Sequence, residues 1–314
     1  MARKELEQID KRFHESKLKK IFNHILVGLM IGLSYLPFWI LYRISDLMYL
    51  IVRFAVRYRY KVITQNLKNA FPEKSEKEIA TIRKQFYRHF CDMFFESIKM
   101  YSISEKQMDQ HIIFKGHTES IKFFDKGKSV IILASHYNNW EWCSSVQGKI
   151  KHLVLMIYNP IRGNFAMEKF LLNSREKWGG KCVPVHQTAR SIFSYNKKGQ
   201  LTGAWLAADQ TPPASSSFWT IFMNQETPFF SGPEKIAHAT NQPIFFQHVK
   251  KTGRGKYEAN YSMLCENPQE MEQKDILIAY IRKTEEIIRE EPAYYLWSHR
   301  RWKHKRPEGI ELTT

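Results

Sequence analysis

The stretch that decides the fold is VIILASHYNNWEW, residues 130 to 142. A continuous apolar run over residues 129–133 follows the turn residues 126–128, and such a run predicts a strand that is buried on both faces. His136 comes just after this run, and Glu141 follows five positions later. The stretch therefore predicts a core strand that ends beside two side chains capable of chemistry.

Further short apolar runs alternate with segments of helical periodicity along the chain. This alternation predicts an α/β domain with a largely parallel central sheet flanked by helices. The predicted strands cover residues 129–133, 152–158, 181–185, 201–209, 243–249 and 256–264, the last two joined as a hairpin. The predicted helices cover residues 75–101, 165–180, 188–199, 233–242 and 274–292, the first opening with a Ser75/Glu78 capping box.

The N-terminal part of the chain predicts membrane attachment. Residues 25–42 contain no Asp, Glu, Lys, Arg or His, and eighteen residues are the lower limit for a membrane-spanning helix. Pro37 would kink such a helix, and basic residues flank both ends. The segment could span the bilayer, lie in its interface, or form a buried hairpin. We expect basic, membrane-anchoring helices over residues 1–57 and the α/β domain over residues 58–314.

The net charge of the chain points to an anionic partner. Lys and Arg number 48 against 31 Asp and Glu, a formal charge of +17. Nucleic acid, a membrane surface and a phosphorylated substrate all fit this balance. The four cysteines form no C-x-x-C pair and no zinc-site spacing, which is typical of reduced thiols.

His136 and Glu141 invite a catalytic interpretation. In an open α/β sheet, ligands bind at the carboxyl ends of the strands. Asp209 also ends a predicted strand, so it could face the same crevice. Residues five apart on one helix point about 140° apart, at roughly 100° per residue. A strand, an asparagine turn and a new helix would instead let Glu141 fold back onto one imidazole nitrogen, while the other takes a proton from a substrate hydroxyl.

Other interpretations of these two residues remain open. A lone histidine at a strand end is often structural, and His with Glu could bind a metal if a third ligand were present. The signatures of serine hydrolases, phosphate-binding loops and dinucleotide folds are missing from the sequence.

SHYNNWEW resembles the H-x-x-x-x-[DE] signature of the glycerolipid acyltransferases, in the form seen in bacterial lipid A biosynthesis acyltransferases. The similarity extends to the segments LSYLPFWILYRISDLMYLIVRFAVRYRYKVITQNLKNAFPEKSEKE, FYRHFCDMFFE, SREKWGG, LAADQTPP, TPFFSGPEKIA and YYLWSHRRWKHKRP. These segments cover nearly the whole chain, so the domain over residues 58–314 resembles the catalytic domain of that superfamily.

The resemblance implies an O-acyltransferase of the bacterial inner membrane whose active site faces the cytoplasm. An acyl carrier protein, or acyl-coenzyme A, would deliver the acyl group as a thioester, without metal or bound cofactor. The acceptor would be a hydroxyl of a lipid A precursor in an anionic membrane. By this analogy His136 is the general base and Glu141 its orienting partner, while Arg175, Asp209 and Gln210 match positions that contact substrate.

One segment departs from the family pattern. Many relatives carry a basic residue directly after the tyrosine of YNPIRGN, where this chain has Asn159. Arg162, three residues later, is the candidate for the substrate contact of that basic residue.

Two other classes of function fit parts of the sequence. The chain could acylate a lysophospholipid or another lipid alcohol, or bind lipid without catalysis. A nucleic-acid-binding protein would use aromatic and basic residues such as those of SHRRWKHKR. The uncharged run over residues 25–42 argues against nucleic acid as the partner.

Overall fold

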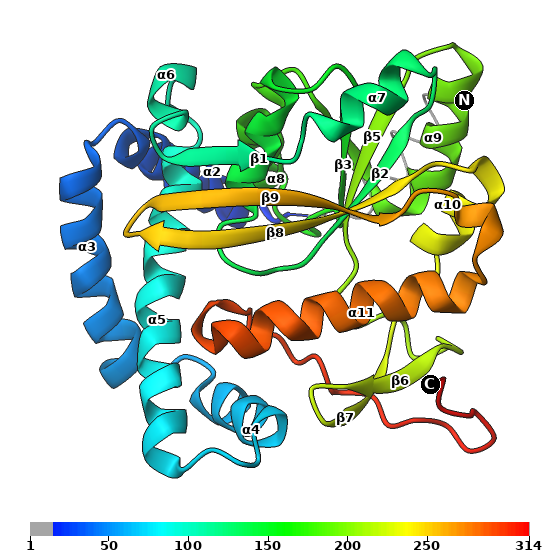
Figure 1. The fold of residues 1–314 in the computed structure, drawn as a ribbon. Coiled ribbons are helices and arrows are strands. Elements are labelled where there is room, and N and C mark those ends of the chain that lie inside the picture. Colours follow the sequence, from blue (N-terminus) through cyan, green and yellow to red (C-terminus); the bar gives the residue numbers. More distant parts are fainter. Residues whose placement is uncertain (1–14, 314) are drawn as a thin grey trace.

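The computed structural model describes residues 15–313 and contains a seven-stranded sheet (Figure 1). Its strand order is β1-β9-β8-β2-β5-β3-β4, and every neighbouring pair runs parallel except the β8–β9 hairpin. The predicted α/β fold with a largely parallel central sheet is therefore confirmed. Residues 1–14 of the predicted basic N-terminal segment lie outside the described residues.

The elements follow the predicted alternation closely. The strands of the large sheet are β1 (Ile112–Lys115), β2 (Val130–Ala134), β3 (Leu153–Tyr158), β4 (Lys181–Pro184), β5 (Thr202–Ala207), β8 (Ile244–Gly253) and β9 (Lys256–Cys265). The helices are α2 (Lys17–Ser34), α3 (Phe38–Leu50), α4 (Tyr60–Ala70), α5 (Glu76–Lys99), α6 (Glu105–Met108), α7 (Glu119–Asp125), α8 (Phe165–Glu176), α9 (Thr188–Lys197), α10 (Pro233–Thr240) and α11 (Gln273–Glu290). A separate hairpin joins β6 (Trp219–Phe222) to β7 (Gln225–Pro228).

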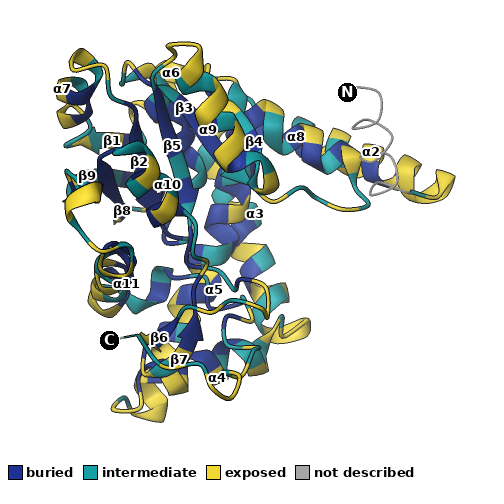
Figure 2. Cartoon of the chain, turned by 90° about the vertical axis from the view of Figure 1, so that its right-hand side faces the viewer, coloured by how far each residue is buried: buried dark blue, intermediate teal, exposed yellow. Residues whose placement is uncertain are grey.

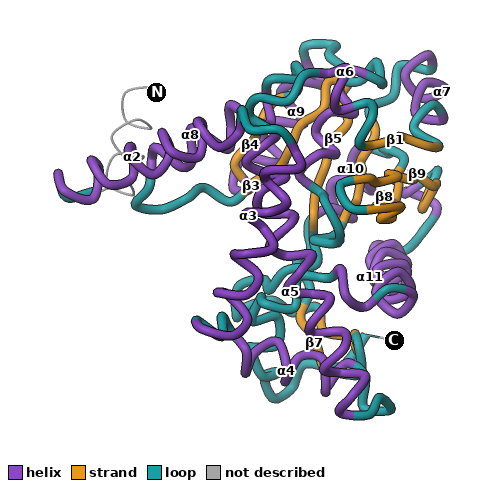
Figure 3. Tube along the Cα trace, turned by 90° about the vertical axis from the view of Figure 1, so that its left-hand side faces the viewer, coloured by secondary structure: helices purple, strands orange, loops and turns teal. Residues whose placement is uncertain are grey.

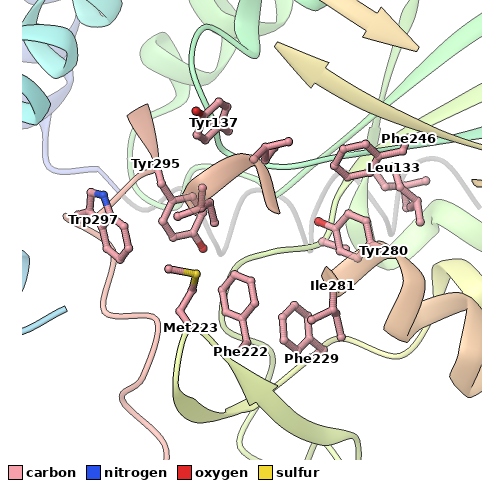
Figure 4. Packing of buried hydrophobic residues seen from close by; sticks show 14 of the residues in the cluster. Leu133, Tyr137, Phe222, Met223, Phe229, Phe246, Tyr280, Ile281, Tyr295 and Trp297 are labelled. Carbon is pink, nitrogen blue, oxygen red and sulfur yellow. The ribbon is translucent and has the colours of Figure 1, made fainter. Parts of the chain in front are cut away.

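Strand β2 lies in the middle of the sheet and is buried along its whole length. Ile131 and Leu133 belong to the core on one face, and Val130 and Ile132 to the core on the other. This alternation divides the apolar residues of one strand between two helical layers, as a doubly covered sheet requires. On the first face Leu133 packs near Phe246 and the helix α11 (Figure 4).

The long helix α5 connects the N-terminal helices to the sheet domain. The Ser75 hydroxyl accepts from the Glu78 backbone, and the Glu78 carboxylate accepts from the Ser75 backbone at 2.8 Å. This confirms the predicted capping box. Helix α3 packs along α5, and the two run side by side down one edge of the molecule (Figures 1 and 3).

The uncharged segment over residues 25–42 forms two helices, because the chain turns at Tyr35–Pro37 between α2 and α3. Pro37 cannot continue the hydrogen-bond ladder of α2, so the predicted kink becomes a break. Among the described residues, no helix has the length and apolar character needed to cross a membrane. Figure 2 shows α2 and α8 projecting from the body of the protein, with exposed residues along α2.

Candidate active site

The pairing of β2 with β5 brings two candidate residues together. The two strands are parallel neighbours, and Ala134 lies opposite Ala207 at their carboxyl ends. His136 and Asp209 each follow two residues later, so both emerge at the same edge of the sheet. Asp209 therefore lies at the strand end that the sequence indicated, but its buried side chain contacts His136 and does not line the crevice as expected.

His136 and Asp209 form a hydrogen-bonded pair. The imidazole Nδ1 lies 2.8 Å from Asp209 Oδ1, and the backbone N–H of His136 donates to the same oxygen at 3.0 Å. Burial of Asp209 would raise its pKa, but the charge and hydrogen bonds of His136 outweigh burial and lower the pKa of this carboxyl. An ionised Asp209 accepts from Nδ1–H, which leaves Nε2 of His136 as the nitrogen that can take a proton.

The chain turns after His136 through a buried polar loop. Asn138 has a left-handed backbone with φ 53°, which asparagine adopts more readily than most residues. Its side chain donates to the Val249 carbonyl at 2.7 Å. Asn139 Oδ1 accepts from the Trp142 backbone at 3.2 Å, at the start of a 3₁₀ helix over Glu141–Gly148. The asparagines thus provide the turn that the sequence predicted, whereas the N-cap position of the 3₁₀ helix is Trp140 and not an asparagine.

Glu141 is held by an arginine from α8. Arg175 donates from Nε at 2.8 Å and from Nη2 at 2.6 Å, a two-pronged contact, and Trp140 Nε1 adds a third hydrogen bond. Burial would raise the pKa of Glu141, yet the charge and hydrogen bonds of Arg175 lower it. Arg175 in turn has a raised pKa, because Glu141 more than offsets its own burial.

The predicted hydrogen bond from Glu141 to the imidazole is not the one that the structure shows. Asp209 already occupies Nδ1 of His136, and the planar guanidinium of Arg175 matches both oxygens of Glu141. The sequence marked all four residues but paired them wrongly, because neither ion pair is local along the chain.

These residues border a cavity of about 660 Å³ beside the sheet. His136, Glu141, Arg175 and Gln210 line it, whereas Asp209 lies behind His136 and is only 1% exposed. The apolar part of the lining includes Val154, Met156, Ile157, Leu171, Leu172, Leu206, Phe230 and Ile236. A largely apolar cavity with a few convergent polar groups at one end is typical of a site for an amphiphilic ligand.

Arg162 is not among the residues that line the cavity. Its side chain is exposed and outside the cavity lining, whereas Asn159 lines the cavity. The predicted role of Arg162 as the replacement for a basic residue at position 159 stays a prediction, since Ile161 lines the cavity and the exposed Arg162 follows directly after it.

The basic C-terminal signature is partly a buried support for the site. Trp297 and Arg301 are buried, and Arg301 donates to the Pro228 carbonyl at 2.6 Å. Burial and the charge of nearby His136 lower the pKa of His299 to about 4. Figure 4 shows that Trp297 and Tyr295, both from this signature, pack in the same core as Met223. Exposed basic residues of the signature are Arg300, Lys303 and Lys305.

Among the described residues, no three or more His, Cys, Asp or Glu side chains gather in a way that could hold a metal ion. The site thus consists of a His–Asp pair, a Glu–Arg pair and an apolar cavity.

A sequence model of the bacterial lipid A biosynthesis acyltransferases matches residues 9–304. The chain belongs to this family. It is also 25% identical over 304 residues to the lipid A biosynthesis lauroyltransferase of Escherichia coli (strain K12), covering 90% of this chain and 92% of that protein.

In this acyltransferase, removal of Arg175 should destabilise the fold in a pH-dependent way. Arg175→Met leaves Glu141 without its cation, which we expect to cost roughly 3 kcal/mol, the lower end for a broken buried ion pair. Burial is then opposed only by the Trp140 hydrogen bond and the charge of His136, so the pKa of Glu141 rises, and the loss of stability shrinks as the pH falls and the carboxyl is protonated. Urea unfolding over a pH series measures this change.

The double variant Glu141→Gln/Arg175→Met serves as the control. It removes the unpaired charge of Glu141 and should recover part of the free energy of unfolding that Arg175→Met loses at neutral pH. Equal losses in the single and double variants, with no pH dependence, would contradict the ion-pair account.

Proposed function

We propose that this protein transfers a fatty acyl group from an acyl carrier protein thioester to a hydroxyl of a lipid A precursor, with His136 as the general base. The observation that carries the proposal is the His136–Asp209 pair at the edge of a largely apolar cavity. Family membership and the similarity to a lauroyltransferase support lipid A acylation. The formal charge of +17 suits both an acidic carrier protein and an anionic glycolipid.

The proposed reaction needs no protein nucleophile. Nε2 of His136 removes the proton from the acceptor hydroxyl as its oxygen attacks the thioester carbonyl carbon. The tetrahedral intermediate collapses, the carbon–sulfur bond breaks, and the leaving thiolate takes the proton back from the imidazolium. The products are an ester and a free thiol. Asp209 stabilises the imidazolium and fixes the tautomer, the role that the sequence assigned to Glu141.

The remaining residues hold the substrates. The apolar lining of the cavity suits the acyl chain. Glu141 fixes Arg175 at the cavity wall, where the guanidinium supplies positive charge to anionic or carbonyl oxygens of the substrates. Gln210, directly after Asp209, offers a neutral amide to the acceptor.

A transfer assay in detergent tests this proposal. Wild type should move radiolabelled acyl groups from the carrier protein thioester to a lipid A precursor, and His136→Ala should lower kcat by about 10²- to 10⁴-fold. His238→Ala, a histidine on α10 outside the cavity lining, should retain activity. Parallel reactions with the coenzyme A thioester and with lysophospholipids compare donors and acceptors.

Equal rates for wild type and His136→Ala would exclude His136 as the base. Transfer to lysophospholipid alone would mean that the acceptor is a lysophospholipid and not a lipid A precursor. A wild type that binds lipid but transfers no label in any reaction would favour the non-catalytic binding protein.

We further infer that α2, α3 and the short π-helix Ile51–Ala55 that follows α3 lie on the cytoplasmic surface of the bacterial inner membrane without crossing it. Large apolar side chains on these elements and at Tyr35 between them are exposed: Leu18, Ile21, Phe22, Ile25, Leu29, Tyr35, Trp39, Leu47, Leu50, Ile51 and Phe54. Exposed basic residues on the same elements are Lys17, Lys19, Lys20 and Arg43. Apolar side chains beside Lys and Arg are typical of helices that lie in the membrane interface.

Vesicle sedimentation tests this membrane contact. Replacing Ile21 and Ile25 by Glu should reduce binding to vesicles with anionic lipid at least about tenfold, because two apolar side chains that insert into the membrane interface become charged. Ile113→Glu, an equally exposed isoleucine on β1, should bind as wild type does. Equal binding by all three proteins would contradict the proposed surface.

A further inference from the structure

A buried carboxylate stands next to the loop that carries His136 and Glu141. Glu96, on the long helix α5, is 1% exposed although it forms no ion pair among the described residues. A buried carboxylate is costly unless donors surround it. The hydrogen bonds to Glu96 therefore show which side chains offset the cost of burying it.

Three side chains from three different parts of the fold donate to Glu96. Tyr42 of α3 donates its hydroxyl to Oε1 at 3.0 Å. Tyr257 of β9 donates to Oε2 at 2.7 Å, and Asn139 Nδ2 donates to the same oxygen at 2.8 Å. Asn139 is the only one of the three that lies between His136 and Glu141.

Asn139 ties Glu96 to the geometry of the loop. While Nδ2 donates to Glu96, Oδ1 accepts from the Trp142 backbone and starts the 3₁₀ helix that carries Glu141. The Trp142 indole also donates to the backbone carbonyl of Glu96 at 3.0 Å. Helix α5 thus holds this loop through two independent hydrogen bonds at the same residue.

The loop depends on such anchors because it has no regular secondary structure of its own. Asn138 is left-handed, and both asparagines are completely buried. A buried amide that loses its acceptor must find another by moving. A displacement of about 1 Å in a group that takes part in catalysis can lower the rate about 10²-fold.

We propose that Glu96 is a positioning residue for acyl transfer, which acts through Asn139 to hold His136 and Glu141 at the cavity. This inference rests on the proposed function, since it concerns the same site. Glu96 touches no substrate in this account, and its effect should fall on the chemical step rather than on binding.

Exchange of donor and acceptor tests the link. Asn139→Asp turns a carboxylate oxygen toward the Glu96 carboxylate, so the two side chains no longer match. We expect kcat to fall about 10- to 100-fold while KM changes less than about threefold. Adding Glu96→Gln restores the match with its direction reversed, because the introduced amide can donate to the carboxylate at position 139. The double variant should recover kcat to within about fivefold of wild type.

Asp92→Asn is the matched control. Asp92 lies one turn before Glu96 on α5, is also buried, and bonds to Ser45 and Arg254 rather than to the loop. Asp92→Asn alone should leave kcat near the wild-type value. Added to Asn139→Asp in place of Glu96→Gln, the same change from carboxylate to amide should not restore kcat. Recovery by Asp92→Asn equal to that by Glu96→Gln would reduce Glu96 to a general structural role and overturn the proposal.

The remaining outcomes are also decisive. An unchanged kcat in Asn139→Asp, or no recovery in the double variant, would overturn the proposal. If wild type transfers no label, the proposed function fails, but the positioning role is still decided by nuclear magnetic resonance. The ring signals of His136 must then shift in Asn139→Asp and return in the double variant, and unchanged signals would overturn it.

Discussion

The parallel pairing of β2 with β5 is the constraint on which the site depends. Because Ala134 lies opposite Ala207, the residues two positions further on, His136 and Asp209, meet at the carboxyl edge of the sheet. A shift of one residue in this register would turn the buried strand β2 over and separate the pair. The core that fixes the register is therefore also what aligns the proposed base with its carboxylate.

Three carboxylates surround the loop after β2, and each has its own donors. Asp209 takes the imidazole, Glu141 takes the Arg175 guanidinium, and Glu96 takes neutral donors that include Asn139. This division keeps three acidic groups close together with every one bound to a donor, as buried polar groups require. It also means that the loop is held from the sheet, from α8 and from α5 at once.

Much of the fold could be predicted from local patterns, whereas the pairing of side chains could not. The apolar run before His136 and the capping box at Ser75 identified β2 and α5, because both signals lie within a few residues. Glu141 was paired with His136 because they are near in sequence, yet Arg175 and Asp209 reach the two residues from other elements. Glu96 ends the segment FYRHFCDMFFE that resembles the family, but no role was predicted for it, since one acid on an amphipathic helix is usually exposed. The short strands β1, β6 and β7 were missed, whereas β4, also of four residues, was predicted because the glycines that close the preceding helix mark its start.

The most direct test of the central claim is the tautomer of His136, measured by nitrogen-15 resonance of labelled histidine at a pH where the imidazole is neutral. The chain has 12 histidines, so the His136→Ala variant assigns the signal. The account predicts a proton on Nδ1 in wild type, kept in Glu141→Gln and lost or shifted in Asp209→Asn. A proton on Nε2 in wild type, or a tautomer that responds to Glu141→Gln and ignores Asp209→Asn, would contradict it.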